Sequence, residues 1–184
     1  VYICLIERAN IKKDDFVLIH SATGGVGQAA IQICNMLGAK IITTAGTEEK
    51  RKKLREEFNI EYISDSRNPD IFKKDILNFT NNEGVDVILN SLSDKSLLTN
   101  FEIIKNEGII VEIGKRDSLE NNKIDLNPFL KSITYTSVHF DRLYNSNPKY
   151  IHETFYKVIE LFDSNILKPI DIETFHISET VSYT

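Results

Sequence analysis

The sequence predicts an α/β domain with a doubly wound, Rossmann-type parallel sheet of six main strands. Short apolar and β-branched runs alternate with helical segments along most of its 184 residues. The strand segments are nearly continuous in apolar residues, which indicates that helices cover both faces of the sheet. The first strand runs into a glycine-rich turn and a helix, as in a βαβ unit that binds a phosphate.

The first βαβ unit starts at residue 16 with the apolar run Phe-Val-Leu-Ile. Gly24, Gly25 and Gly27 follow, and a helix begins among them. Such a turn places the backbone N–H groups of the helix start against a phosphate. Ala22 stands where the strict G-x-G-x-x-G pattern has its first glycine, so the turn there requires a negative φ. One helical stripe is predicted to face the core: Val26, Ala29, Ala30, Ile33 and Leu37.

The remaining elements follow in alternation. Strands are predicted at 40–45, 61–64, 85–89, 109–113 and 133–138, and helices at 48–58, 69–79, 94–104 and 148–162. Gly38 is a helix stop, Thr47 a helix cap and Pro69 a helix start. Residues 1–8 have the pattern of a helix end, and the periodic pattern weakens from Lys168. We therefore predict a nucleotide-binding domain over 1–167 and a segment that leaves this domain over 168–184, and we expect the chain to be part of a longer protein.

Composition excludes several classes of partner. A net charge of -5 and a pI near 5.4 argue against nucleic acid and against an anionic membrane surface. No apolar run approaches the ~18 residues that span a bilayer. Cys4 and Cys34 lie in apolar helical contexts, so we predict buried free thiols in a reducing, cytoplasmic compartment. The histidines lack metal-ligand spacing, so no metal is predicted, and His20 is expected to be a packed or hydrogen-bonded residue.

The end of the second strand indicates which nicotinamide cofactor is bound. Enzymes that use NAD usually place an acid there to hold the ribose 2′-hydroxyl. Here no carboxylate occurs before Glu48, and Gly46 leaves room for a 2′-phosphate. Lys50 and Arg67 supply cations and Thr47 a hydroxyl, which suit a dianionic phosphate. The alternative is that Lys50 belongs to an ordinary solvated helix face. The missing acid favours NADPH, with Thr23, Gly24, Gly25, Val26 and Gly27 around the pyrophosphate.

Polar residues also follow the fourth and fifth strands. Asn90, Ser91 and Leu92 end the fourth strand, and Gly114 and Lys115 end the fifth. Ligands of open α/β sheets bind beyond the carboxyl ends of the strands at the switch point, so these groups are expected to approach the nicotinamide and its ribose. The alternative for Asn90 is a turn residue that satisfies the local backbone.

Three stretches carry a family resemblance: 20–30 (HSATGGVGQAA), 85–92 (VDVILNSL) and 112–117 (EIGKRD). Through them the chain resembles the enoyl reductase domain of animal fatty acid synthases and iterative polyketide synthases, in the medium-chain dehydrogenase/reductase superfamily. The likeness covers about residues 1–170. The first stretch is shared with quinone reductases, whereas the other two are more specific to the synthases. The resemblance implies the cofactor-binding half of a reductase, inactive alone, whose residues 168–184 lead back to a substrate domain.

The resemblance also implies a reaction and its partners. The reaction is NADPH-dependent reduction of an enoyl thioester on an acyl carrier protein, with other synthase domains flanking this one. Lys115 and Asp141 match the candidate proton donors of the family, while His139 and water remain alternatives. Lys115 and Asp141 could instead form a solvated or structural ion pair. Pairing of the last strand, 133–138, would give a homodimer.

Two other functions compete with this interpretation. A stand-alone quinone or enone reductase shares the glycine loop and Lys50, but the later motifs disfavour it. A non-catalytic nucleotide-binding scaffold should have lost the glycine loop or Lys115, and this chain keeps both. Whether the parent is a polyketide or a fatty acid synthase stays open at this point.

Overall fold

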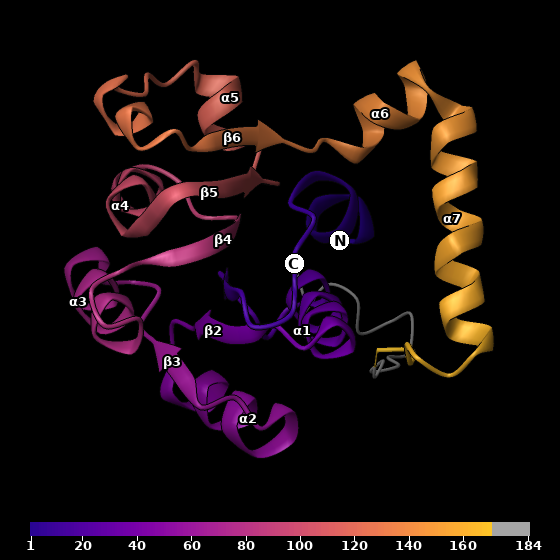
Figure 1. The fold of residues 1–184 in the computed structure, drawn as a ribbon, viewed down its shortest axis with the longest axis horizontal. Coiled ribbons are helices and arrows are strands. Elements are labelled where there is room, and N and C mark those ends of the chain that lie inside the picture. The colour runs from indigo at the N-terminus through magenta and orange to yellow at the C-terminus, as the bar shows by residue number, and fades with distance from the viewer. Residues whose placement is uncertain (171–184) are drawn as a thin grey trace, which may run out of the picture.

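Six parallel strands form one sheet in the order β3-β2-β1-β4-β5-β6 (Figure 1). The computed structural model describes residues 1–170. The strands are β1 (Phe16–Ile19), β2 (Lys40–Thr44), β3 (Tyr62–Ser64), β4 (Val85–Asn90), β5 (Ile104–Glu112) and β6 (Thr134–Ser137). Strand order reverses between β1 and β4, which defines the switch point where ligands of such sheets bind. The predicted Rossmann-type sheet is therefore confirmed.

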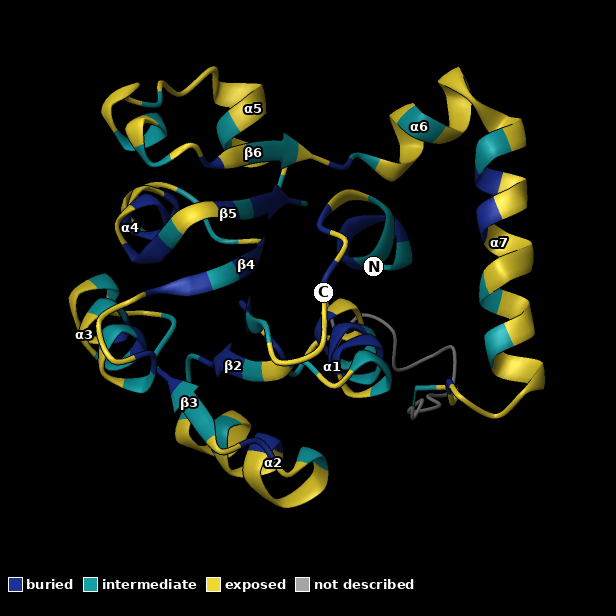
Figure 2. Ribbon diagram, viewed as in Figure 1, coloured by how far each residue is buried: buried dark blue, intermediate teal, exposed yellow. Residues whose placement is uncertain are grey.

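Helices cover both faces of this sheet. They are η1 (Ile3–Arg8, a π-helix), α1 (Gly25–Leu37), α2 (Glu48–Phe58), α3 (Pro69–Phe79), α4 (Lys95–Ile103), α5 (Arg116–Glu120), η2 (Asn127–Lys131, a 3-10 helix), α6 (Phe140–Ser146) and α7 (Pro148–Asp163). One apolar core lies between the sheet and η1, α1 and α7, and a second lies under α3 and α4. Alternate residues of β1 serve the two cores, Val17 the first and Leu18 the second. In Figure 2 the central strand β4 is largely buried, whereas the edge strand β6 has no buried residue and the outer faces of the helices are exposed.

The predicted helix boundaries have the expected local causes. Gly38 ends α1 in the left-handed conformation at φ 72°. The Thr47 hydroxyl oxygen caps α2 by accepting the Lys50 N–H at 3.3 Å. Pro69 stands in the first turn of α3, behind the capping side chain of Asn68. Cys4 and Cys34 are buried free thiols, as predicted.

The strand predicted at 109–113 is longer in the structure and begins at Ile104. The first part of this strand includes the polar, exposed residues Asn106 and Glu107, so it lacks the apolar pattern by which strands were predicted. The pairing of β5 with β4 is irregular there, and Glu107 has a φ of 62°. The short helices α5, η2 and α6 were also not predicted, because each is too short to show a helical period.

The stripe predicted on α1 is partly wrong. Ala30 and Ile33 are buried as expected, but Val26 is 50% exposed, and Gly27, Ile31 and Cys34 are buried in its place. Val26 lies in the first turn, where α1 begins beyond the carboxyl end of β1. A side chain at this point extends past the sheet and cannot reach the core.

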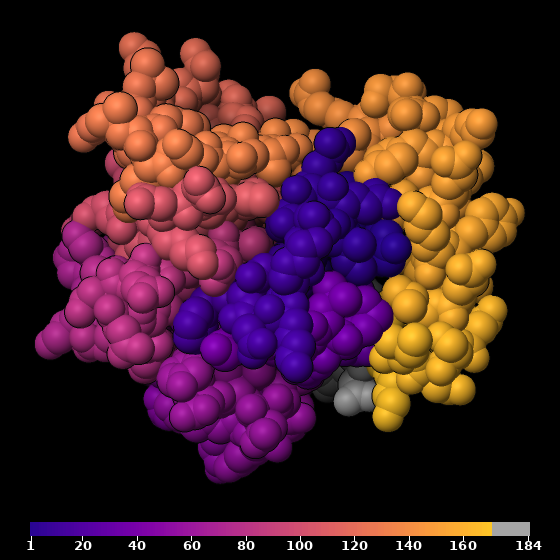
Figure 3. All heavy atoms as spheres, in the orientation of Figure 1, coloured from indigo at the N-terminus to yellow at the C-terminus, as the bar shows by residue number. Residues whose placement is uncertain are grey.

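The first residues of the chain tie α7 to the rest of the domain. Figure 3 shows the N-terminal segment between the sheet and α7. Glu7 of η1 accepts hydrogen bonds from the Tyr150 hydroxyl and from the Lys157 ammonium, the latter at 3.0 Å. Gln32 of α1 bonds both backbone groups of Lys168, at 3.0 and 2.8 Å. The rest of the predicted exit segment, residues 171–184, lies outside the described residues.

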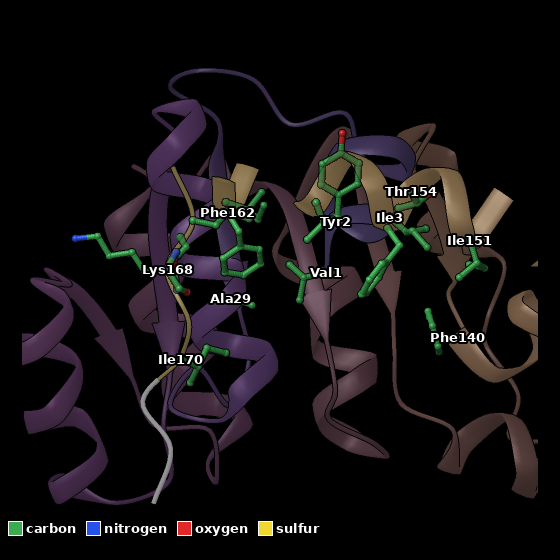
Figure 4. A pocket seen from close by; sticks show the side chains of 15 residues that line it. Val1, Tyr2, Ile3, Ala29, Phe140, Ile151, Thr154, Phe162, Lys168 and Ile170 are labelled. Carbon is green, nitrogen blue, oxygen red and sulfur yellow. The ribbon is translucent and has the colours of Figure 1, made fainter. Parts of the chain in front are cut away.

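An apolar cavity of about 280 Å³ lies between α1, η1 and α7 (Figure 4). Val1, Ile3, Ala29, Ile151 and Phe162 are among its lining residues. None of the residues predicted to bind the cofactor lines this cavity. Within residues 1–170, no helix combines the length and the apolar character needed to cross a bilayer.

Candidate functional site

The start of α1 presents free backbone N–H groups beyond β1. Gly24 occupies the N-cap position without a side-chain cap from the described residues. The first bond of the helix runs from the Gln28 N–H to the Gly24 carbonyl at 2.9 Å. The N–H groups of Gly25, Val26 and Gly27 therefore precede the intrahelical ladder and carry the positive end of the helix dipole. This is the arrangement that binds a phosphate.

Ala22 and Gly27 explain how the turn works without the first glycine. Ser21 takes the left-handed conformation at φ 53°, and Ala22 does not, so the methyl group of Ala22 is tolerated. A Cβ on Gly27 would lie 2.4 Å from the Ala22 backbone. Gly27 thus permits α1 to approach the end of β1 closely, whereas a Cβ on Gly25 would meet nothing within 4 Å.

The end of β2 brings Gly46 against Arg67. A Cβ on Gly46 would lie 2.8 Å from Arg67 Nε and 3.3 Å from the Ser66 hydroxyl. Lys50 stands in the first turn of α2, next to the cap at Thr47. The structure therefore gathers the residues predicted for a 2′-phosphate. It adds Ser66, which the sequence analysis did not select because a lone serine in a loop carries no pattern.

Lys50 and Arg67 differ from the other cations of this region. The remaining basic residues of α2 all pair with carboxylates; they are Arg51, Lys52, Lys53 and Arg55. Within the first 170 residues, neither Lys50 nor Arg67 forms a salt bridge. Among the described residues both cations thus lack a carboxylate partner, and Arg67 lies against Gly46 at the end of β2. That Lys50 and Arg67 bind a phosphate stays a prediction.

Asn90 at the end of β4 holds its own turn. Its side chain is buried, donates to the Leu92 carbonyl at 2.7 Å and accepts the Leu92 N–H at 3.2 Å. These bonds match the turn role that was the alternative for Asn90. The exposed Ser91 lies next to Gly114 of the neighbouring loop, since a Cβ on Gly114 would be 3.8 Å from the Ser91 backbone carbon. It stays a prediction that a cofactor contacts Asn90, Ser91, Leu92 and Gly114.

A row of buried polar side chains crosses the sheet beneath these loops. His20 Nδ1 lies 2.9 Å from the Thr44 hydroxyl, and His20 Nε2 lies 2.8 Å from Asn100 Oδ1. The Asn100 amide donates to Asn90 Oδ1 at 2.8 Å, and the Asn90 amide donates to Glu112. His20 is a packed and hydrogen-bonded residue, as expected, and burial lowers its pKa to about 4.

Glu112 ends this row as a buried acid. Burial is the largest influence and raises the pKa of Glu112 to about 7, although hydrogen bonds from Asn90 and from the Gly114 N–H act in the opposite direction. The Gly114 N–H lies 2.5 Å from Glu112 Oε1. Glu112 and Asn100 were not among the predicted site residues. A glutamate that interrupts an apolar strand before a glycine is the signal that could have identified Glu112.

Lys115 and Asp141 meet as predicted, although 26 residues separate them. Lys115 Nζ lies 2.8 Å from Asp141 Oδ1, and the two side chains are 51% and 60% exposed. The hydrogen bond from Lys115 lowers the pKa of Asp141, so this carboxyl is an anion at neutral pH. The alternative donor, His139, has a buried Nδ1 without a hydrogen-bond partner in the described part of the chain.

The glycine turn at the start of α1, the strand order and the loops beyond β4 and β5 define a dinucleotide-binding α/β domain. The family model of zinc-binding dehydrogenases matches residues 25–164. Highly reducing polyketide synthase PKS2 of Leptosphaeria maculans is 37% identical over 183 residues, which are 98% of this chain and 7% of that protein.

Two solved structures extend the likeness. The nucleotide-binding subdomain of the enoylreductase domain of PpsC from Mycobacterium tuberculosis is 34% identical, with a TM-score of 0.85, over 92% of this chain and 93% of that one. CurK enoyl reductase is 30% identical with a TM-score of 0.85, over 98% of this chain and 53% of that one. The chain belongs to the zinc-binding dehydrogenase family and, within it, to the enoyl reductase domains of polyketide synthases.

The family description names zinc, which the described residues do not suit. No three His, Cys, Asp or Glu side chains of residues 1–170 gather where they could hold a metal ion. The chain spans about 7% of the length of the curated synthases that it matches.

Proposed function

We propose that this chain is the cofactor-binding half of an NADPH-dependent enoyl reductase, which reduces the α,β-double bond of a carrier-bound enoyl thioester in polyketide synthesis. One observation carries the proposal: the free N–H groups of α1 and the Lys115 loop lie at the same carboxyl edge of the sheet, around the switch point. The enoyl reductase domains among the similar proteins support the same reaction.

The residues at this edge suit the parts of NADPH. The N–H groups of Gly25, Val26 and Gly27 would bind the pyrophosphate. Lys50 and Arg67 would bind the 2′-phosphate, because charge-assisted hydrogen bonds to two cations offset its dianionic charge. The hydroxyls of Thr47 and Ser66 lie beside them. When bound, the cofactor supplies the hydride that adds to the β-carbon of the thioester.

Cofactor choice is tested by titrating this chain with NADPH and with NADH. Lys50→Ala should weaken NADPH binding about tenfold, since it removes one charge-assisted bond worth roughly 1.5 kcal/mol, and should leave NADH binding unchanged. Lys52→Ala is the matched control, because Lys52 lies on the same helix and pairs with Glu56 at 3.8 Å. Equal losses for Lys50→Ala and Lys52→Ala, or equal wild-type affinities for the two cofactors, would contradict a 2′-phosphate site.

Lys115 is the residue for the proton step. Hydride addition at the β-carbon leaves an enolate, which needs a cation near its oxygen and a proton at its α-carbon. The Lys115 ammonium offers both, and the anionic Asp141 holds it in place at 2.8 Å. Asp141 itself is a poor donor, because its lowered pKa keeps it ionised. In this proposal Asp141 positions Lys115 and gives up no proton.

Turnover needs the longer protein, because the chain covers 53% of the similar CurK reductase. The full-length polypeptide should oxidise NADPH with a crotonyl thioester, and the 184-residue chain should bind NADPH without turnover. Lys115→Ala in the full-length protein should slow reduction and leave NADPH affinity nearly intact. Unchanged turnover would remove Lys115 from the mechanism. Efficient reduction by the isolated chain would refute the division into two halves.

The remaining partners follow from the same proposal. They are the acyl carrier protein that bears the substrate and the other synthase domains of one cytoplasmic polypeptide. β6 lies at the edge of the sheet, so one side of its backbone is open to a second copy. We therefore include a homodimer through β6. Sedimentation of this chain tests it: Ser137→Pro removes a backbone N–H from the open side of β6, because the Val138 N–H next to it bonds Glu112 of β5, and should shift a dimer to monomer.

A further inference from the structure

We propose that Glu112 is a positioning residue that joins the loop after β4 to the loop after β5, and so shapes the part of the site that receives the nicotinamide half of the cofactor. The inference rests on the proposed function. Glu112 touches neither reacting atom in this proposal, and acts through the two loops that it holds.

The two carboxylate oxygens of Glu112 bind different loops. Oε1 accepts the Gly114 N–H at 2.5 Å, directly before Lys115. Oε2 accepts the Asn90 amide, at the start of the loop that contains Ser91. A Cβ on Gly114 would lie 2.7 Å from Oε1, so a glycine is needed for the carboxylate to approach this closely. The side chain therefore bridges two segments that are 22 residues apart in the sequence.

The hydrogen-bonded row fixes the direction in which each group donates. The Thr44 hydroxyl donates to His20 Nδ1, the His20 Nε2–H to Asn100, the Asn100 amide to Asn90, and the Asn90 amide to Glu112. Each asparagine accepts on one side and donates on the other. A row of this kind must end on a group that only accepts, and an ionised carboxylate is such a group. A glutamine at this position would place its own NH₂ group against the Asn90 amide or the Gly114 N–H, both of which are donors.

The surroundings of Glu112 give no other reason for a carboxylate. Glu112 is 3% exposed and has no salt bridge with the described residues. Asp117 of α5 and Tyr135 of β6 are the other titratable groups near it, and the charge of Asp117 is of the same sign. A buried acid without a cation destabilises the fold, so its presence at a ligand-binding edge points to function.

The test compares the binding of two ligands, NADPH and a fragment of it without the nicotinamide half. NADPH reaches both ends of the proposed site, whereas 2′,5′-ADP lacks the nicotinamide half and needs only the loop after β1 and the cations beside Gly46. Both are titrated at pH 8, where the carboxyl is ionised, against wild type, Glu112→Gln and Thr80→Val. Thr80 is the matched control: its buried hydroxyl also accepts a glycine N–H, that of Gly84 at 3.0 Å, but before β4 at the opposite edge.

Glu112→Gln should weaken NADPH about tenfold, as the loss of one charged hydrogen bond implies, and leave 2′,5′-ADP within about twofold. Thr80→Val should leave both affinities within about twofold. If Glu112→Gln lowered the affinity for both probes equally, or for neither, the role of Glu112 would be overturned. Binding of NADPH by wild type would in that case still support the proposed function. A wild type that binds neither probe would refute the proposed function and this inference together.

A second measurement needs no variant. In the nuclear magnetic resonance spectrum of the wild-type chain, the Gly114 amide proton should be shifted downfield, slow to exchange, and sensitive to pH with a midpoint near the Glu112 pKa of about 7. A Gly114 amide that exchanges freely and does not titrate would show that the bridge is not formed.

Discussion

Replacing Glu112 by glutamine should change how the stability of this domain depends on pH. The folded pKa of Glu112 is raised by burial to about 7, against an ordinary value of 4.5. Between these values the folded chain holds the proton that the unfolded chain has lost. The contribution of Glu112 to stability is therefore complete at low pH and falls as pH rises toward 7. At about 1.4 kcal/mol per pH unit, the loss amounts to about 3 kcal/mol.

His20 acts in the opposite direction over nearly the same range. Its folded pKa is lowered by burial to about 4, against 6.5 ordinarily, so the unfolded chain binds the extra proton. This contribution to stability grows from about pH 4 to 6.5, again by about 3 kcal/mol. The two contributions nearly cancel in wild type. Glu112→Gln removes one of them and leaves the rise due to His20 visible.

The assay is urea unfolding followed by circular dichroism, at intervals from pH 4.5 to 8. The free energy of unfolding of Glu112→Gln, minus that of wild type, should increase by about 3 kcal/mol across this range. Subtraction removes the groups that the two proteins share, among them Asp117 and Tyr135 beside the site. Thr80→Val, which changes no titratable group, should differ from wild type by a constant. A difference for Glu112→Gln that is also constant, or that decreases with pH, would refute the reasoning.

Further predictions concern the fold around the site. Gly27→Ala should lower the free energy of unfolding by about 2 kcal/mol because of its clash with the β1 turn, while Gly25→Ala, which meets nothing, should be neutral or stabilising. Burial raises the pKa of Glu7, but hydrogen bonds from Tyr150 and Lys157 of α7 outweigh it, so the pKa is lowered overall. Glu7 should therefore stabilise the fold above its unfolded pKa. In acid unfolding titrations, the advantage of wild type over Glu7→Gln should vanish as pH falls through the folded pKa of Glu7. Lys131 donates to three carbonyls around the end of α4. Lys131→Met should therefore lower the free energy of unfolding in urea by about 1 kcal/mol, whereas Lys149→Met, at an exposed position, should leave it unchanged. Equal effects of the two substitutions would contradict this role of Lys131.

Local patterns identified most of the fold and the outline of the site. The apolar runs at β1 and β4 and the glycine turn between β1 and α1 were readable because each depends on neighbours within one element. Lys115 and Asp141 were selected through a family resemblance, and the structure brings them to 2.8 Å. Segments with too few residues for a period, such as α5 and α6, were not found.

The amino-acid sequence by itself determined the sheet class, the phosphate-binding turn and the absence of an acid before Glu48, because periodicity, glycine geometry and residue type act over a few neighbouring positions. Only the tertiary structure decided which charges are satisfied. Arg67 met Gly46 only in the folded chain, and Glu112 gained its role from Asn90 and Gly114 together. The physical reason is that burial and pairing depend on groups 20 to 80 residues away, which only folding brings within hydrogen-bond distance.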